Sequence, residues 1–466
     1  MTHIAISAAS LSKWINGEIL LTNFGGSVHL VGTDTRTLPE NSCYFALLGE
    51  RNDGHDFVDE AIRRGAKIVV VQRGNRPDWT RWADSGVDIV SVDDTTAGLG
   101  MLAKHWRRQW GGHAVVITGS NGKTTTKEYT AAALETSGDV LRTPGNWNNH
   151  IGLPLTIFGL QQQRYAVLEI GTNAPGEIAT LADIAQPNVA ILTNVAPAHL
   201  LGLGSIDGVA TEKGALFRAL PKDGTAIVNL DDPYVVKVAG DVAVHKITYG
   251  TVPHADIRIL GVESPTLGNL VIHLSIAGKS ITQQLNGLGV HLAHNAAAAV
   301  GAAMALGMDP EVAFCGIQHA QPAGHRLTLR HTIQGVHIID DCYNANPGSM
   351  AASLAALANL PIGGRRIAVL GDMLELGETS PILHRQLGAA VQKARVDVLV
   401  AVGQFANDVL DGAKAAGFTG RGYVVATNAD ALFITDDLKP GDCLFVKGSR
   451  GIALEKVVDA ALRGIG

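Results

Sequence analysis

Cysteine is scarce in this chain of 466 residues, which contains only Cys43, Cys315, Cys342 and Cys443. The four lie far apart in the sequence and include no Cys-x-x-Cys pair. A disulfide framework is therefore not predicted, and we expect reduced core residues of a cytosolic protein.

Clustered positive charge and long apolar runs are also missing. Charged residues make up 17% of the chain, the net charge is −6, and no long basic run occurs. Nucleic acid is thereby excluded as the main partner, because affinity for phosphate backbones rests mainly on clustered Lys and Arg. No apolar stretch reaches the length of a membrane span, and the start "MTHIAISAASLSKW" lacks the pattern of a secretion signal. We expect a cytoplasmic monomer without stable membrane insertion.

The length predicts several domains, because one core does not grow to this size. We predict an α/β protein of three domains, covering residues 1–110, 111–323 and 324–466. The central domain combines a parallel sheet of the phosphate-loop type with an antiparallel excursion between about 245 and 285, where polar and apolar residues alternate. Apolar strands and helices then alternate after residue 325, which predicts a doubly wound, Rossmann-like domain. The linker "QHAQPAGHR" marks its start.

The stretch "VVITGSNGKTTTKE", residues 115–128, resembles a phosphate-binding loop but has Ile117 where the strict pattern requires glycine. An apolar strand precedes the loop and a helix is predicted from about Lys123, so backbone N–H groups and the helix N-terminus would converge on an anion. We therefore predict a shortened loop. Its predicted nucleotide-binding residues are Gly119, Ser120, Asn121, Gly122, Lys123, Thr124 and Thr125.

Two further side chains follow predicted strands. Glu169 ends the strand in "AVLEIGTN", and His199 lies beyond the strand in "AILTNVAPAHL". With the Thr124 hydroxyl they form a candidate magnesium site beside the phosphates of ATP. Taken alone, His199 is better interpreted as a capping or packing residue, and the neighbouring Glu169 and loop favour the metal role.

These segments together resemble the Mur ligases, the ATP-dependent amide-forming enzymes of peptidoglycan synthesis, over essentially the full chain. The family loop is similar to "TGSNGKTTTKE" and also lacks the first glycine, while "LEIGTN" and "TNVAPAHLLGLGS" resemble its metal-site segments. "VATEKGALF" resembles the segment that carries a carbamylated lysine, which implies Lys213. The resemblance implies two Mg²⁺ ions, held by Thr124, Glu169, His199 and carbamylated Lys213, and Lys123 as a further catalytic residue. By sequence pattern alone, Lys213 is an ordinary lysine on a helix surface.

Within the family, "IDDCYNANPGSM" (339–350) is similar to the signature of one branch. That branch joins D-alanyl-D-alanine to UDP-N-acetylmuramoyl-tripeptide through an acyl phosphate, in cytoplasmic peptidoglycan precursor synthesis. It thereby serves cell wall biogenesis, cell shape and cell division. "AVLGDMLELG" and "FVKGSRG" support the same branch.

The resemblance also implies binding residues for each substrate. For ATP it adds Asn295, Arg326 and Asp341 to the loop. For the UDP-sugar it implies Asp34, Arg36, Arg51, Asp53, His55, Asn146, Asn148 and Asn149. For the incoming dipeptide it implies Tyr343, Asn344, Asn346 and Lys447. Taken singly, many of these are turn, helix-capping or surface residues.

Two positions depart from the family pattern. The segment near adenine, G-x-H-N-x-x-N, is "GVHLAHN" here, so His291 and Asn295 remain but Leu292 replaces the first Asn. After Lys213, the usual Gly-Glu is replaced by Gly214 and Ala215.

The sequence leaves alternatives open. One is the branch of the family that adds a diamino acid, and another is a ligase resembling folylpolyglutamate synthetase. A nucleotide-gated binding protein without ligation belongs to a different class. The sequence also does not determine whether the tripeptide ends in lysine or diaminopimelate.

Overall fold

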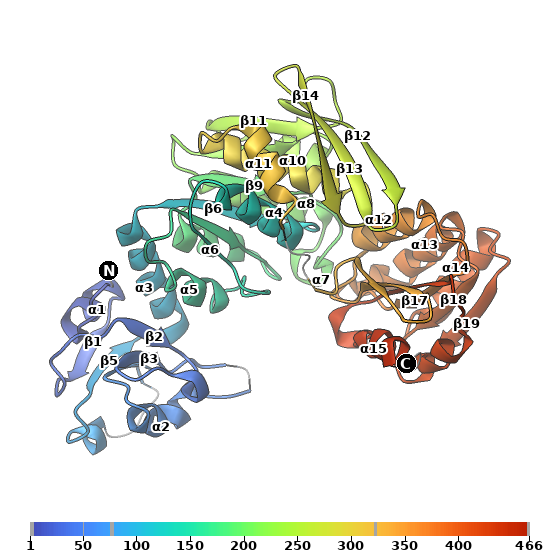
Figure 1. The fold of residues 1–466 in the computed structure, drawn as a ribbon. Helices are drawn as coiled ribbons and strands as arrows, with labels where there is room; N and C mark the ends of the chain where they lie inside the picture. The colour runs from blue at the N-terminus through green and yellow to red at the C-terminus, as the bar shows by residue number, and fades with distance from the viewer. Residues whose placement is uncertain (1–3, 50, 75–78, 321–323, 464–466) are drawn as a thin grey trace.

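The computed structural model describes residues 4–49, 51–74, 79–320 and 324–463. Three sheets follow one another along the chain, and the central one lies between the other two (Figure 1). We call the parts around them the N-terminal, central and C-terminal domains. The predicted fold class is confirmed. The predicted boundary at residue 323 lies outside the described residues.

The N-terminal domain is built on a five-stranded sheet in the order β1-β5-β4-β3-β2, in which only β1 is antiparallel. Strands β4 and β5 carry mainly apolar, buried residues. The elements are α1 (Ala8–Trp14), β1 (Glu18–Leu21), β2 (Leu30–Gly32), η1 (Thr35–Thr37), β3 (Ser42–Phe45), η2 (Gly54–Phe57), α2 (Val58–Arg63), β4 (Ile68–Gln72), η3 (Trp79–Trp82), β5 (Asp88–Val92) and α3 (Thr95–Trp110).

Helix α3 joins this domain to the central one. The Trp106 indole N–H donates to the Leu160 carbonyl at 3.1 Å, and the Arg107 guanidinium donates to the Ala185 carbonyl at 3.0 Å. Around these bonds one hydrophobic core runs without interruption from the N-terminal sheet to one face of the central sheet. The two domains are therefore held together by buried apolar surface.

The central sheet has nine strands in the order β14-β13-β12-β11-β10-β9-β6-β8-β7. The antiparallel excursion is confirmed for β12 to β14, whereas β11 pairs in parallel with both neighbours. The strands of the central sheet are β6 (His113–Thr118), β7 (Val140–Arg142), β8 (Tyr165–Glu169), β9 (Val189–Leu192), β10 (Thr225–Asn229), β11 (His245–Gly250), β12 (Ile257–Thr266), β13 (Asn269–Ile276) and β14 (Lys279–Asn286).

Helices cover both faces of this sheet (Figure 1). The Ala-rich α10 is buried along most of its length, because small side chains let it approach the strands and α4 closely. The helices are α4 (Lys123–Glu135), α5 (Gly152–Ile157), α6 (Glu177–Ala185), α7 (Leu200–Leu203), α8 (Ile206–Arg218), α9 (Pro233–Gly240), α10 (Leu292–Ala305) and α11 (Pro310–Ile317).

The C-terminal domain is the predicted doubly wound unit, with strand order β15-β16-β20-β17-β18-β19 and only β15 antiparallel. Its elements are β15 (Thr328–His331), β16 (His337–Asp341), α12 (Pro347–Ala358), β17 (Arg366–Gly371), η4 (Gly377–Thr379), α13 (Ser380–Lys393), β18 (Val398–Val402), α14 (Ala406–Ala415), β19 (Arg421–Val425), η5 (Asp430–Asp437), β20 (Cys443–Lys447), η6 (Arg450–Ile452) and α15 (Glu455–Arg463). Within the described chain, every helix is too short or too polar to cross a lipid bilayer.

A buried carboxylate fixes α8 against α6. Glu212, on α8, accepts the backbone N–H groups of Gly176 and Ile178, each at 2.7 Å. These donors lie at the N-terminus of α6, where helical N–H groups have no partner within the helix and the dipole favours negative charge. The position of Glu212 therefore sets the position of the next residue, Lys213.

We predict that Glu212→Gln lowers the free energy of unfolding by about 2 kcal/mol, because a buried anion that accepts two N–H bonds is replaced by a neutral amide. Urea unfolding followed by circular dichroism measures it. Asp207→Asn on the same helix is the control, because Asp207 is exposed and pairs with exposed Lys237, so the substitution should change stability by less than about 0.5 kcal/mol. Equal effects of the two substitutions would contradict the anchoring role of Glu212.

Candidate active site

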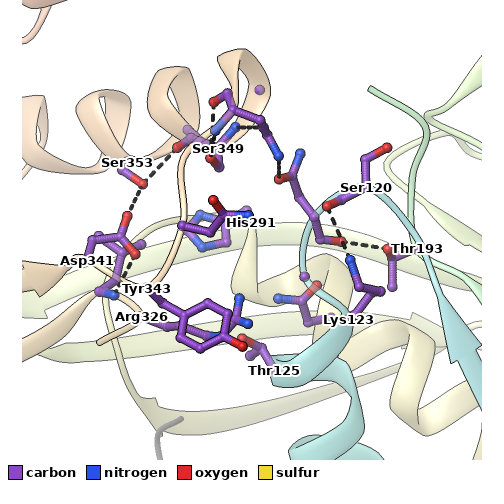
Figure 2. A pocket seen from close by; sticks show the side chains of 18 of the residues that line it. Ser120, Lys123, Thr125, Thr193, His291, Arg326, Asp341, Tyr343, Ser349 and Ser353 are labelled. Carbon is purple, nitrogen blue, oxygen red and sulfur yellow. Dashed lines mark hydrogen bonds between the residues drawn. The ribbon is translucent and has the colours of Figure 1, made fainter. Parts of the chain in front are cut away.

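A cavity of about 1340 Å³ opens between the central and C-terminal domains. Its central-domain wall is the loop after β6 with the ends of β8 and β9. Its opposite wall comes from residues 324–329, the segment after β16 and the N-terminus of α12. Figure 2 shows Lys123 and Thr125 on one side and Arg326, Tyr343 and Asp341 on the other. In open α/β sheets ligands bind at the carboxyl ends of strands, which is where both walls lie.

The loop between β6 and α4 depends on two glycines. Gly119 has φ +153° and Gly122 has φ +79°, and a Cβ atom would lie 1.8 Å from the Thr193 hydroxyl or 2.6 Å from the Asn295 amide oxygen, respectively. Ile117 is a buried residue of β6, paired with Glu169 of β8, so the strict first glycine has no place in this loop. No side chain caps the N-terminus of α4, which is consequently open to an anion.

Lys123, the first residue of α4, lies on the cavity wall. Its ammonium donates to the Gly119 carbonyl at 2.8 Å, which holds it over the loop. Burial lowers its pKa, the carboxylate of Glu169 opposes this shift, and Arg326 from the C-terminal domain adds to it. Two cations thus approach one another from opposite domains. An anion bound between them would relieve their repulsion.

Glu169 is buried at the end of β8, and both of its carboxylate oxygens accept hydrogen bonds. The Thr124 hydroxyl donates to Oε2 and the Asn148 amide to Oε1, each at 2.8 Å. The structure therefore brings together two of the predicted metal ligands. It adds Asn148, which the family resemblance had assigned to the UDP-sugar.

His199 is the N-cap residue of α7, yet its side chain makes no capping hydrogen bond. Its Nδ1 lies 2.7 Å from a carboxylate oxygen of Glu375 in the C-terminal domain. Burial lowers the His199 pKa, the bond to Glu375 opposes that, and the nearby Lys213 and Lys123 lower it further. The capping interpretation is therefore wrong, and His199 lies in the field of both lysines.

Lys213 is not the surface residue that its sequence pattern predicts, because only 1% of it is exposed. Burial, and next to it the charge of Lys123, holds the pKa of this amine well below its usual range. Among the residues that the structure describes, none forms a hydrogen bond with the amine. A lowered pKa favours the neutral form of this amine, which is the form that carbamylation requires.

A preformed cluster of three or more His, Cys, Asp or Glu suited to a metal is absent from the described part of the chain. The predicted set contains two such residues, Glu169 and His199, with Thr124 as a neutral hydroxyl. Carbamylation would add a carboxylate-like group at the buried Lys213 amine, for which the described residues provide no hydrogen-bonding partner. The residues present therefore fit magnesium only with that modification.

Comparison with known proteins decides the family. Three family models match in order: the Mur ligase family catalytic domain at residues 27–107, the Mur ligase middle domain at 117–303 and the Mur ligase glutamate ligase domain at 325–450. The chain is 36% identical to the UDP-N-acetylmuramoyl-tripeptide–D-alanyl-D-alanine ligase of Bacillus subtilis over 96% of both chains. It is 34% identical to that of Escherichia coli over 98% of both. The chain belongs to the Mur ligase family.

Solved Mur ligase structures have the same fold. A crystal structure of MurF from Acinetobacter baumannii matches with a TM-score of 0.88 and 30% identity, over 99% of this chain and all of that one. The MurF ligase from Thermotoga maritima in complex with ADP matches with a TM-score of 0.81 and 27% identity, over 94% of this chain and 97% of that one.

On the C-terminal side of this Mur ligase cavity, Asp341 is the centre of a buried network. One of its oxygens accepts from the Leu327 N–H at 3.1 Å, and the other lies 2.7 Å from the Ser353 hydroxyl and 2.6 Å from the Lys447 ammonium. Lys447 also donates to the Asn344 carbonyl. These contacts fix the segment after β16, so Asp341 and Lys447 have a structural role whatever they bind.

Arg326 and Tyr343 form the part of this wall that faces the loop. The guanidinium lies 4.0 Å from the centre of the Tyr343 ring, a cation–π contact that holds the arginine in the cavity. The interpretation of Arg326 as a solvated surface residue is therefore wrong.

Asn346 caps α12, as the sequence allowed, and also reaches across the cavity. Its side-chain oxygen accepts the Ser349 N–H at 2.8 Å, while its amide donates to the Asn121 side chain, also at 2.8 Å. The backbone of Asn121 is held in turn by Asn194 and Thr193 of the central domain. The phosphate loop and α12 are thus linked across the domain boundary.

The structure divides the predicted UDP-sugar residues into two sets. Asn146, Asn148 and Asn149 line the cavity. The N-terminal set does not: Asp34 pairs with exposed Arg36, Arg51 is exposed, and Asp53 caps η2. His55 is buried, with its Nδ1 on Asp53 and its Nε2 accepting the Gln72 N–H. Their assignment to a UDP-sugar stays a prediction.

The segment where the family's first Asn is replaced packs as apolar structure. Leu292, the first residue of α10, is buried in the core, and burial lowers the pKa of His291 to about 4. Asn295 accepts from the Thr126 hydroxyl at 3.3 Å. Two further residues that line the cavity, His294 and Glu375, were not among the predicted site residues. Nε2 of His294 lies 2.8 Å from a carboxylate oxygen of Asp231. The quoted segments "GVHLAHN" and "AVLGDMLELG" contained His294 and Glu375, but nothing in their spacing indicated a partner.

We predict that the Asn121–Asn346 bond couples the two domains energetically. In a double-mutant cycle, Asn346→Ser retains a helix cap and Asn121→Ala leaves the loop backbone intact, so both remove chiefly the shared bond. The free energies of unfolding of the single and double variants should show a coupling of about 1 kcal/mol. Additive effects would mean that the bond contributes nothing.

Proposed function

We propose that this Mur ligase uses ATP to join D-alanyl-D-alanine to UDP-N-acetylmuramoyl-tripeptide in the cytoplasm. The observation that carries the proposal is that the phosphate loop and the "DDCYNANP" segment face each other across one cavity. The relatives of 34–36% identity bear the name of this ligase, which favours this branch over the one that adds a diamino acid. Buried free thiols at Cys43, Cys342 and Cys443 agree with a reducing compartment.

The division of labour follows the three predicted domains. Residues 1–110 with the Asn146–Asn149 segment would bind the UDP-sugar, residues 111–323 would bind ATP, and residues 324–466 would bind the dipeptide. The nucleotide complex of the Thermotoga maritima relative supports the middle assignment. In this chain the loop, Lys123 and Arg326 would surround the phosphates, and Tyr343 and Asn344 would face the dipeptide.

The reaction begins with the approach of two anions. An oxygen of the tripeptide carboxylate attacks the γ-phosphorus, and the bond from that phosphorus to the β-phosphate oxygen breaks. ADP departs, and the tripeptide then carries an acyl phosphate. Lys123 and the N-terminus of α4 oppose the negative charge that grows on the transferred group. Arg326 adds a positive charge from the C-terminal side. Magnesium, held by Thr124, Glu169, His199 and carbamylated Lys213, would neutralise further phosphate charge.

The second half forms the amide. The dipeptide amine attacks the acyl carbon, the carbon–oxygen bond to phosphate breaks, and the nitrogen loses a proton as inorganic phosphate leaves. Holding both reactants in one cavity between two domains makes this step effectively unimolecular. The enclosing walls also limit the access of water, which would hydrolyse the acyl phosphate.

Paired substrates test the proposal. Phosphate release should be at least about a hundredfold faster with the tripeptide and D-alanyl-D-alanine than with the dipeptide precursor and a diamino acid, because polar groups shaped for one substrate are left unpaired by another. Lys123→Ala serves as the inactive control for both pairs. The reverse preference would assign the chain to the other branch, and phosphate release independent of the amine would exclude a ligase.

Carbamylation of Lys213 has its own test. Lys213→Ala should lower turnover by about a hundredfold or more at saturating magnesium, because a proposed ligand of the magnesium that neutralises phosphate charge is lost. Formate or acetate should restore part of the activity by occupying the vacated space, whereas short amines should not. Exposed Lys237 on neighbouring α9 is the matched control, and Lys237→Ala should leave turnover unchanged. Full activity of Lys213→Ala would refute the carbamate.

A further inference from the structure

Two residues with strained backbones meet across the domain boundary. His199 in the central domain and Glu375 in the C-terminal domain have φ angles of +53° and +63°, the left-handed region that residues with a side chain rarely adopt. Such strain persists only where surrounding structure imposes it, and it is concentrated at functional sites.

Glu375 makes two contacts with the segment that carries His199. A carboxylate oxygen of Glu375 lies 2.7 Å from Nδ1 of His199, and the Glu375 carbonyl accepts the Leu201 N–H at 3.3 Å. Leu201 lies in the first turn of α7, where N–H groups have no partner within the helix. One residue of the C-terminal domain therefore fixes both the ring of His199 and the turn that carries it.

The segment that presents Glu375 is firmly held on its own side. The Met373 N–H donates to His384 and the Leu374 N–H to the Ser449 hydroxyl, each at 3.0 Å. Met373 and Leu376 are buried in the core of the C-terminal domain. The carboxylate consequently projects from a rigid base, as a group that orients another must.

From this geometry we infer that Glu375 is a positioning residue for His199. By accepting a hydrogen bond from Nδ1–H, it fixes the tautomer in which Nε2 carries the lone pair, and it sets the direction of the ring in the cavity. Ligand histidines are commonly held this way by a carboxylate, which raises affinity for the metal. The inference rests on the metal role of His199 in the proposed function.

The His199–Glu375 pair adds little to the free energy of unfolding. The side chains of His199 and Glu375 are 24% and 55% exposed, and ion pairs of such exposure contribute little to folding. Their partnership across two domains has a different consequence. The ring of His199 is oriented only while the C-terminal domain lies in the observed arrangement, so closure of the cavity and completion of the metal site become a single event.

The tautomer of His199 can be observed without metal or turnover. In full-length protein labelled with ¹⁵N-histidine, with the His199 signal assigned from His199→Gln, the Nδ1–H form should dominate in the wild type. Glu375→Ala should shift the population toward Nε2–H, and Glu375→Gln, which keeps an acceptor oxygen, should restore most of it. Glu378→Ala is the matched control, an exposed carboxylate three residues away. An unchanged tautomer in Glu375→Ala overturns the inference.

Metal binding gives the second measurement, with Mn²⁺ alone as the probe and free Mn²⁺ followed by electron paramagnetic resonance. Glu375→Ala should weaken binding about tenfold or more, as loss of such a partner usually does, while Glu378→Ala should not. If His199→Ala weakens binding but Glu375→Ala does not, the positioning role is refuted. If His199→Ala binds Mn²⁺ like the wild type, the metal role in the proposed function fails instead, and the tautomer alone decides the role of Glu375.

Discussion

Positive charge gathered at the carboxyl edge of the central sheet is the constraint on which this site depends. Lys213 is buried, Lys123 lies close enough to lower its pKa, and Arg326 approaches from the other domain. In the described structure, the carboxylate of Glu169 partly offsets the charge of Lys123. Like charges in a poorly solvated cavity repel strongly, so the arrangement is suited to a ligand that brings several negative charges. A nucleotide triphosphate has that property, and a carbamate on Lys213 would replace an amine of this cluster by a group with one negative charge.

The same edge explains why the domains meet where they do. Strands of the central and C-terminal sheets end at opposite walls of one cavity, and the bonds Asn121–Asn346 and His199–Glu375 cross it. Neither bond is strong by itself. Together they tie the phosphate loop and a candidate metal ligand to the domain that would bring the amine. A ligase needs this coupling, because an acyl phosphate formed before the amine is in place is lost to water.

Much of the fold follows from local patterns. The buried strand before "TGSNGK", the Ala-rich α10 and the strands of the C-terminal domain are each specified by a few neighbouring residues. The loop glycines were also evident, since turns with positive φ require them. Lys213 was different. Its neighbours in sequence are those of a surface lysine, and its burial arises from the packing of α8 in the fold, where Glu212 is anchored at the N-terminus of α6.

The sequence by itself determined the class of fold, the glycine loop after β6 and the place of Glu169 at the end of β8, because these depend on short segments whose pattern reflects helix and strand geometry. Its motifs also carried the resemblance to the Mur ligases. Only the tertiary structure decided that Lys213 is buried and has no hydrogen-bonding partner among the residues described. It also decided that Asn346 reaches Asn121 and that His199 meets Glu375. Those pairs are separated by 225 and 176 residues. No local rule connects positions so far apart, since their contact depends on how whole domains pack.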